Sequence, residues 1–246
     1  MSAITTEKTV GELAAENPAA TRVFEELGID YCCCGGSTLE QACRAAGLLP
    51  DAVRDSIEVA VETARAGAPV RDWTTEPLAD LIAHIQNTHH RFTRAEISRL
   101  GPLFDKVCSV HGKKHPELAS LRATFGDLAL ELSTHMMKEE MVLFPYIERM
   151  EEAVLEKSAV VPPPFGSVRN PVAMMMHEHD GAGQALAEMR QASHAYTVPP
   201  DACVSYSTLY RALDEFETDL HQHIHLENNI LFPRAIEMEK AHGMRP

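Results

Sequence analysis

From Pro77 onward, apolar residues recur every three or four positions along four long segments. These segments cover roughly residues 77–108, 117–150, 170–195 and 203–240, and they are separated by Gly- and Pro-containing runs such as VVPPPFGSVRNP. This spacing places one apolar stripe along each helix, and the alternation typical of strands is nearly absent. Four helices of this length with short connections predict an all-α, antiparallel four-helix bundle.

A shorter segment of different composition precedes the bundle. Residues 1–66 are rich in Ala and show short helical patterns on both sides of the run CCCGG, which begins at Cys32. The run GAPVRDWTTE, residues 67–76, has the Gly and Pro content of a linker. The chain is therefore predicted to contain a small helical N-terminal domain that carries cysteines, a linker, and a bundle domain over residues 77–246.

The second and fourth predicted helices repeat one motif. HMMKEEMVLFP begins at His135 and HIHLENNILFP begins at His223, so the two copies lie 88 residues apart. Both read H-x-x-x-E and continue four residues later with Leu-Phe-Pro. A histidine on the preceding helix lies 45 residues before the first copy, at His90, and 44 residues before the second, at His179. The bundle is therefore predicted to be a duplicated helical hairpin.

The histidine and glutamate of each motif lie on the apolar face of their helix. Residues four apart on an α-helix differ by only about 40° in direction and ~6 Å along the axis, so both side chains can reach one metal ion. The stripe of the second helix contains Leu121, Phe125, Leu128, Leu132, His135, Glu139 and Val142. The stripe of the fourth helix contains Leu209, Leu213, Phe216, Leu220, His223, Glu227 and Ile230. Both pairs are expected to face the core.

The first and third helices each supply one further histidine. On the third helix, the residues that share a stripe with His179 are Val172, Met175, Ala182, Leu186 and Met189, whereas His177 lies about 200° away. On the first helix, the pattern does not choose between two neighbours. The residues that share a stripe with His89 are Leu78, Ile82, Ile85 and Phe92. His90 shares one with Ile82 and Ile97, and the duplication also favours His90.

This set of side chains is typical of a metal site. A buried carboxylate without a partner costs several kcal/mol, and a cation removes that cost. Four histidines and two glutamates are too many for one zinc ion, which takes four ligands. Two metal ions that share the carboxylates use the whole set, and mixed imidazole and carboxylate ligands favour iron or manganese. The predicted ligands are His90, His135, Glu139, His179, His223 and Glu227.

Two further carboxylates are candidates to orient these histidines or to relay protons. Glu131 lies one turn before His135, and Glu178 is the neighbour of His179 in the sequence. An exposed helix carboxylate is the other interpretation, and it is the one that the sequence favours for each. The remaining histidines are expected to be solvated or to surround the site; they are His84, His111, His115, His177, His194, His221, His225 and His242.

Charge and cysteine usage exclude some classes of function. Lys and Arg number 22 against 36 Asp and Glu, which gives a formal charge of −14. Nucleic acids and anionic membranes are bound by clustered cations, so neither is an expected partner. The sequence begins without a signal-peptide pattern, and no apolar run approaches the ~20 residues that span a bilayer. A cytoplasmic protein with reduced thiols is expected, with Cys43, Cys108 and Cys203 as buried packing residues.

Several motifs together resemble one family. They are IDYCC with Cys32 and Cys33, DW…PL from Asp72 to Leu78, HMMKEE…LFP, EHD…AG and HIHLENNILFPRA. These motifs cover nearly the whole chain and are similar to those of the RIC (repair of iron centres) proteins, the ScdA/YtfE type of iron–sulfur cluster repair di-iron protein. One position departs from the family pattern Cys-Cys-Gly-Gly, because Cys34 stands where the first Gly usually does.

The resemblance implies a hemerythrin-like bundle that holds two Fe ions in an oxo- and carboxylate-bridged centre, with His90 as the ligand from the first helix. It also implies repair of iron–sulfur clusters damaged by nitrosative or oxidative stress, through iron donation, NO processing, or both. NO reduction would make the protein an oxidoreductase, a point that stays open. Damaged iron–sulfur proteins are the implied clients, NO or O₂ the implied small ligands, and a homodimer through the N-terminal domain the implied assembly.

Other functions compete with this interpretation. A hemerythrin-like sensor of O₂ or NO is the main alternative, in which the bundle would report its ligand state to the N-terminal domain. A ferritin-like oxidase is disfavoured, because that class uses Glu-x-x-His and more carboxylates. Cys32 and Cys33 are candidate redox thiols. Together with Cys34 they could instead bind a partner, contact a second subunit, or form a thiol-rich turn without further function.

Overall fold

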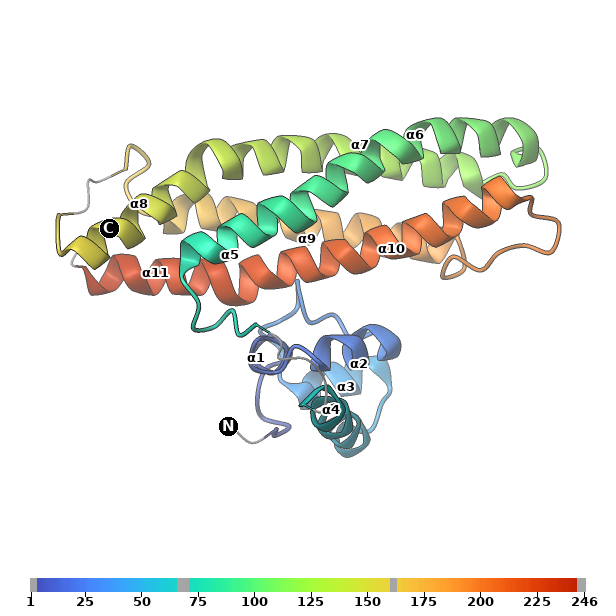
Figure 1. The fold of residues 1–246 in the computed structure, drawn as a ribbon. Coiled ribbons are helices and arrows are strands. Elements are labelled where there is room, and N and C mark those ends of the chain that lie inside the picture. The colour runs from blue at the N-terminus through green and yellow to red at the C-terminus, as the bar shows by residue number, and fades with distance from the viewer. Residues whose placement is uncertain (1–3, 66–70, 160–162, 243–246) are drawn as a thin grey trace.

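The computed structural model describes residues 4–65, 71–159 and 163–242, so residues 67–70 of the predicted linker lie outside the described ranges. Figure 1 shows a small N-terminal domain packed against the side of a long helical bundle. Within the described ranges the regular elements are helices, and strand pairing is limited to one isolated bridge between Thr9 and Thr38. The predicted all-α class is confirmed. None of the helices in these ranges combines the length and apolarity needed to cross a bilayer.

Four short helices form the N-terminal domain: α1 (Val10–Glu16), α2 (Ala20–Leu27), α3 (Leu39–Ala46) and α4 (Pro50–Arg65). Thr9 and Thr38 begin α1 and α3 as capping boxes, in which side chain and backbone exchange hydrogen bonds. Gly28 and Gly47 end α2 and α3 in the left-handed conformation, where a side chain would be strained. The apolar faces of the four helices contribute to one buried cluster, which includes the ring of Phe24.

Four long rods form the bundle. The first consists of α5 (Leu78–Ile85), η1 (Gln86–His90) and α6 (Arg91–His111). The second consists of α7 (Glu117–Lys138), η2 (Glu139–Leu143) and α8 (Phe144–Glu156). The third is α9 (Arg169–Ala192), and the fourth consists of α10 (Val204–Leu226), η3 (Glu227–Leu231) and α11 (Phe232–Ala241). Helix α6 packs on α7 and α10, and α7 packs on α9, so consecutive rods run antiparallel around a common core (Figure 1).

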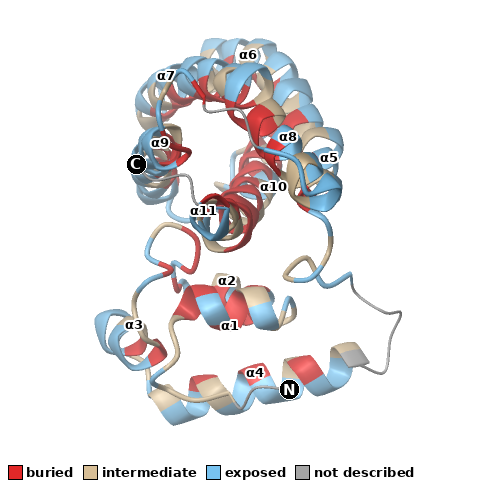
Figure 2. Ribbon diagram, turned by 90° about the vertical axis from the view of Figure 1, so that its left-hand side faces the viewer, coloured by how far each residue is buried: buried red, intermediate tan, exposed pale blue. Residues whose placement is uncertain are grey.

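A polar layer divides the core of the bundle into two apolar clusters. Buried residues face the axis of the bundle along its length (Figure 2). On the second rod, Leu132 belongs to one cluster and Leu143 to the other, with the buried side chains of His135 and Glu139 between them. The predicted ligand positions therefore form a polar layer between the two apolar clusters.

Three of the four rods contain a five-residue π-helical segment at this polar layer, namely η1, η2 and η3. A π turn inserts one extra residue and shifts the apolar stripe beyond it by one position. The prediction for Val142, inside η2, was wrong, whereas the matching residue of η3, Ile230, is buried as predicted. Val142 was expected on the core face but is 46% exposed, whereas its neighbour Leu143 is 1% exposed.

The N-terminal domain is fastened to the fourth rod by Asn229. Its side-chain amide donates to the carbonyl of Tyr31 over 3.1 Å and lies 3.0 Å from Nδ1 of His225, which is buried rather than solvated. Gly11 and Gly35 allow the close approach, because a Cβ on either would lie 2.4 Å from Asn229 Oδ1. The contact places the cysteine-containing loop beside the polar layer.

A buried carboxylate fixes the start of α9, and its removal should destabilise the bundle. Glu239 is 4% exposed and accepts hydrogen bonds from the backbone N–H of Val168 at 2.7 Å and from the hydroxyls of Ser167 and Tyr146. Glu239→Ala removes the acceptor of the buried Val168 N–H and of the Ser167 hydroxyl, so the free energy of unfolding should fall by about 2 kcal/mol. Urea unfolding measures the free energy of unfolding of Glu239→Ala and of the control Glu237→Ala, whose side chain is exposed. Equal losses in the two variants would contradict the assignment.

Candidate metal centre

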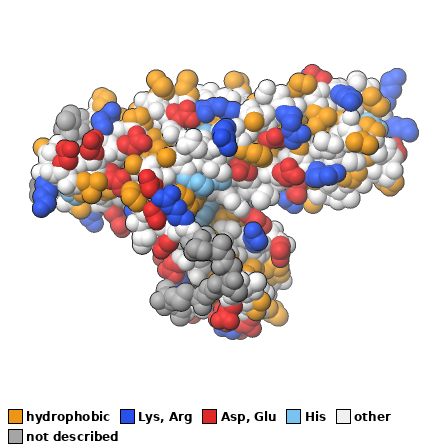
Figure 3. Space-filling view, in the orientation of Figure 1, with side chains coloured by type: hydrophobic (Ala, Val, Ile, Leu, Met, Phe, Trp, Pro, Cys, Tyr) orange, Lys and Arg blue, Asp and Glu red, His pale blue; other side chains and the backbone are white. Residues whose placement is uncertain are grey.

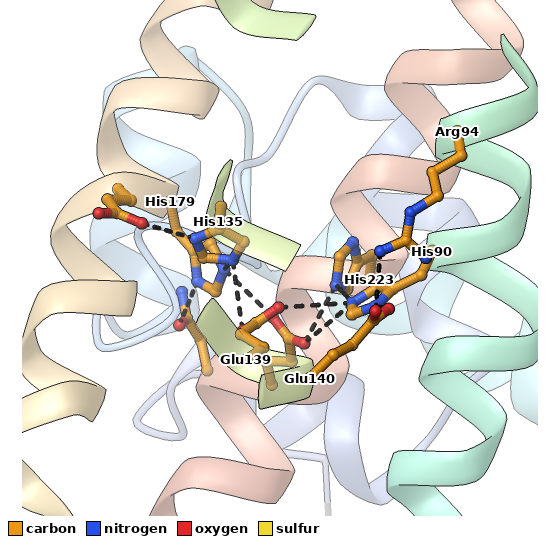
Figure 4. A network of polar contacts seen from close by, with 10 residues as sticks. His90, Arg94, His135, Glu139, Glu140, His179 and His223 are labelled. Atoms are coloured by element: carbon orange, nitrogen blue, oxygen red, sulfur yellow. Dashed lines mark hydrogen bonds and ion pairs between the residues drawn. The ribbon is translucent and has the colours of Figure 1, made fainter. Parts of the chain in front are cut away.

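The structure brings the six predicted side chains together in the polar layer. His90 ends η1, His135 lies in the last turn of α7, and His179 is in the middle of α9. His223 lies in the last turn of α10, and the two glutamates are the first residues of η2 and η3. All six are at most 3% exposed. Figure 4 shows Glu139 between one pair of histidines, His135 and His179, and the other pair, His90 and His223.

The six side chains form two clusters that share both carboxylates. One cluster contains His90, His223, Glu139 and Glu227, and the other contains His135, His179 and the same two glutamates. Within each cluster, one ligand atom from every residue lies within 4.8 Å of the others. The Nε2 atoms are 3.2 Å apart in the first pair of histidines and 3.0 Å apart in the second.

Each glutamate points one oxygen at each cluster. Glu139 Oε1 lies 3.3 Å from His135 Nε2, and its Oε2 lies 3.4 Å from His90 Nε2. Glu227 repeats this arrangement, with Oε1 at 3.0 Å from His223 Nε2 and Oε2 at 3.1 Å from His179 Nε2. Two carboxylates oriented in this way can bridge two cations, each of which would also receive two imidazole nitrogens.

The residues fit a pair of cations because their polar atoms are otherwise poorly satisfied. Both oxygens of Glu139 and Oε2 of Glu227 are buried without a hydrogen bond. Buried carboxylate oxygens normally have partners, and leaving them without one costs free energy. Cations between the imidazole nitrogens and these oxygens would remove that cost. Imidazole and carboxylate together are ligands that suit iron and manganese.

The charges of the site already favour the ionised carboxylates. Burial opposes ionisation of Glu227, but the imidazoles of His223 and His179 outweigh it and hold the pKa of Glu227 well below its usual range. Burial also lowers the pKa of His135, yet the carboxylates of Glu139, Glu227 and Glu178 raise that pKa to about 9. The layer therefore attracts positive charge, whether protons or metal ions.

Three of the four imidazoles are oriented by hydrogen bonds at Nδ1. His90 Nδ1 lies 2.7 Å from Glu140 Oε1, and the other oxygen of Glu140 binds Arg94 at 2.9 Å. His179 Nδ1 lies 2.8 Å from Asn228 Oδ1. Such contacts turn Nε2 toward the centre and fix the tautomer of the ring. Glu140 and Asn228 each directly follow one of the two glutamates that the clusters share, so the duplication could have revealed both, but the sequence interpretation missed them.

The two candidate acids differ in the structure. Glu178 Oε2 lies 2.8 Å from His135 Nδ1, and the same carboxylate pairs with Lys138. Glu131 instead lies on the exposed side of α7. Of the two interpretations of Glu131, the structure agrees with the exposed helix carboxylate, because Leu132 takes the core position on that turn.

The structure also distinguishes His89 from His90. Only His90 directs Nε2 at the cluster, while His89 Nδ1 lies 3.0 Å from Asp219 Oδ1. The ring of His89 stacks on that of His223 at a centroid distance of 5.8 Å. Both histidines are buried at the end of the π segment η1.

A cleft of about 1340 Å³ opens beside the centre, between the N-terminal domain and the bundle. Histidine side chains reach the surface at this junction (Figure 3). Trp73, His84 and His89 line the cleft, and their rings are in contact, with centroids 4.6 Å apart for Trp73 and His84 and 5.6 Å apart for His84 and His89. Since His89 stacks on His223, one ring separates the cleft from the candidate ligands.

The cysteine loop lies against the other side of the centre. Cys33 Sγ is 3.6 Å from the carbonyl oxygen of His179, and Asn228 donates to the carbonyl of Cys32 over 3.2 Å. All six cysteines are free. A hydrogen bond with Cys33, together with burial, raises the pKa of the Cys32 thiol.

The other cysteines were predicted to be buried packing residues, and they differ from one another. Cys43 is buried and Cys108 is half-buried, but Cys203 is exposed at the N-cap of α10. The prediction for Cys203 was wrong because the residue precedes the helix and does not belong to its apolar stripe.

Comparison with known proteins agrees with this architecture. Residues 81–235 match the family model described as the hemerythrin HHE cation binding domain, and residues 6–61 match ScdA_N, a domain of unknown function. The iron–sulfur cluster repair protein YtfE of Pectobacterium carotovorum is 37% identical over 233 residues, which cover 95% of this chain and 98% of that protein. YtfE of Musicola paradisiaca is 37% identical over 239 residues, with the same coverage of both chains.

YtfE of Yersinia pestis strain Pestoides F is similar at 36% identity over 233 residues, which cover 94% of this chain and 98% of that protein. The similarity thus includes both the cysteine-containing N-terminal domain and the bundle with its two histidine pairs. The chain belongs to the YtfE family of iron–sulfur cluster repair proteins, and its bundle is a hemerythrin HHE cation binding domain.

Proposed function

We propose that the protein carries a di-iron centre and repairs damaged iron–sulfur clusters by donating iron, with NO processing as a second activity of the same centre. The observation that carries the proposal is the pair of buried glutamates, Glu139 and Glu227, each of which presents one oxygen to both histidine pairs. The proposed ligands of one iron are His90 and His223, and those of the other are His135 and His179. Oxo bridging between the irons belongs to the proposal.

The donor set and the relatives support iron over other metals. Six imidazole and carboxylate ligands suit iron and manganese, and the relatives are named for iron–sulfur cluster repair. When bound, two irons supply an exchangeable pool of metal and open positions for a diatomic ligand. The protein's own residues hold the ions and orient the imidazoles through Nδ1. The cleft beside His89 offers NO or O₂ an approach to within one ring of the centre.

The proposal also includes client proteins, a location in the cell and an assembly. Damaged iron–sulfur proteins are the proposed clients, and the cytoplasm is the proposed location, in keeping with six free cysteines. A homodimer through the N-terminal domain stays a prediction, as do the domain limits at residues 66 and 77.

The function is tested by following iron from the bundle into a client. The chain is loaded with ⁵⁷Fe and mixed with a [4Fe–4S] enzyme that NO has inactivated. We expect ⁵⁷Fe to appear in the rebuilt cluster, with loss of iron from the bundle. Rebuilding without ⁵⁷Fe transfer would contradict iron donation, and reversible O₂ binding without iron release would favour the alternative of a sensor.

The assignment of ligands predicts a sharp difference between two nearby histidines. His223 is buried with Nε2 at the centre, whereas His221 is partly exposed on the same helix. We expect His223→Ala to lose most of the bound iron and His221→Ala to keep it, as measured by iron per chain after anaerobic reconstitution. Equal iron content in the two variants would mean that the assignment of His223, and not His221, to the inward face of α10 is wrong.

The contact at Nδ1 of His135 predicts a smaller effect. Glu178→Gln removes the charge that holds the imidazole, and the iron affinity should fall by roughly 10–100-fold. Glu131→Gln is the matched control, because Glu131 is exposed on the helix that carries His135. Competition with a chromophoric chelator measures both affinities. An unchanged affinity in Glu178→Gln would show that the carboxylate does not act on the centre.

A further inference from the structure

A second group of potential metal ligands lies in the cysteine loop. The Sγ atoms of Cys32 and Cys33 are 3.7 Å apart, and Cys32 Sγ lies 3.3 Å from Asp30 Oδ1. One atom from each of the three residues lies within 4.8 Å of the others. Sulfur and oxygen ligands at about 2.0–2.3 Å from a tetrahedral ion are ~3.5–3.8 Å from one another. The three side chains are therefore already spaced as ligands of a single ion.

The loop is built in a way that keeps this spacing. Asp30 Oδ1 accepts the backbone N–H groups of Cys32 at 3.1 Å and Cys33 at 2.9 Å, which folds the loop back on the carboxylate. Cys33 Sγ packs so closely on α9 that a Cβ on Gly183 would lie 2.9 Å from it. Cys32 is buried, so two of the three ligands are held by packing on the protein.

We propose that Asp30, Cys32 and Cys33 bind one Fe²⁺ ion in transit between the bundle and a client protein. This inference rests on the proposed iron donation. Thiolates suit iron and zinc, and a carboxylate beside them favours a divalent ion over Cu⁺. Three protein ligands leave one coordination position open, which is the arrangement of sites that exchange ligands rather than store metal.

The position of the loop favours iron from the bundle as the occupant. Cys33 Sγ lies 3.6 Å from the carbonyl oxygen of His179, a proposed iron ligand. Asn228 joins the two sites, because its Oδ1 lies 2.8 Å from His179 Nδ1 and its Nδ2 donates to the carbonyl of Cys32. One side chain thus spans from the loop to the centre.

The bundle supplies Fe²⁺ when its centre is diferrous, and the passage of that ion through the loop to the client then needs no oxidant or reductant. Binding of Fe²⁺ releases the two thiol protons of Cys32 and Cys33 to solvent, while Asp30 binds as a carboxylate. A cysteine thiolate of the client then takes the open position, and the ion leaves with the client as the two loop thiols regain protons. Iron stays ferrous throughout. Cys34 is exposed beside Asp30, at the side of the loop from which a client thiolate can approach.

Co²⁺ is the first probe, used on the full chain after the bundle has been filled with iron. We expect an anaerobic titration to give a thiolate-to-cobalt charge-transfer band that saturates at a single cobalt per chain. Cys33→Ser should abolish the band, and Asp30→Asn should weaken cobalt binding by more than about tenfold. Cys203→Ser is the control, because Cys203 is an exposed thiol at the start of α10. Absence of the band, or a band that survives in Cys33→Ser, overturns the proposal.

Iron itself is tested with isotopes. The bundle is filled with ⁵⁶Fe, an equivalent of ⁵⁷Fe²⁺ is added, and Mössbauer spectroscopy then detects only the added ion. We expect a ferrous signal with thiolate ligands that is lost in Cys33→Ser and kept in Cys203→Ser. A ⁵⁷Fe signal with only nitrogen and oxygen ligands, or a loop that takes Zn²⁺ but not Fe²⁺, overturns the transit site. If the bundle holds iron but the loop gives none of these signals, the transit site is contradicted and the proposed function is not. If the bundle holds no iron, the proposed function is contradicted, while the cobalt result for the loop still stands.

Discussion

The bundle depends on two buried carboxylates that face each other across its axis. Glu139 and Glu227 are fully buried, and the charges opposite them are imidazoles. Charged groups in an apolar interior are tolerated only when they are paired or bind metal. The two apolar clusters on either side of the layer position the helices. The buried carboxylates between them need positive charge beside them. Metal binding and folding of the bundle are therefore linked.

The π segments show how the helices meet this constraint. Glu139 is the first residue of η2 and Glu227 is the first residue of η3, whereas His90 is the last residue of η1. The inserted residue lets a helix turn a ligand inward and still keep its apolar stripe on both sides. The same insertion makes neighbours available for Nδ1 contacts, which is how Glu140 and Asn228 reach His90 and His179.

Much of the fold and the site could be predicted from the sequence, and two of the misses lie at the π segments. The repeated H-x-x-x-E pairs lie on regular helix before the π segments, so a simple period placed His135 and His223 correctly on the core face. The period failed beyond or within those segments, at Val142 and in the choice between His89 and His90. The docking of the cysteine loop through Asn228 depends on tertiary contacts that no local pattern encodes.

The central claim is that two cations share Glu139 and Glu227, and anomalous scattering at the iron edge tests it most directly. A crystal of the iron-loaded chain should show two peaks of equal height between the carboxylates, one beside His90 and His223 and the other beside His135 and His179. A single peak bound to one histidine pair, or density that leaves either glutamate without a metal contact, would contradict the claim.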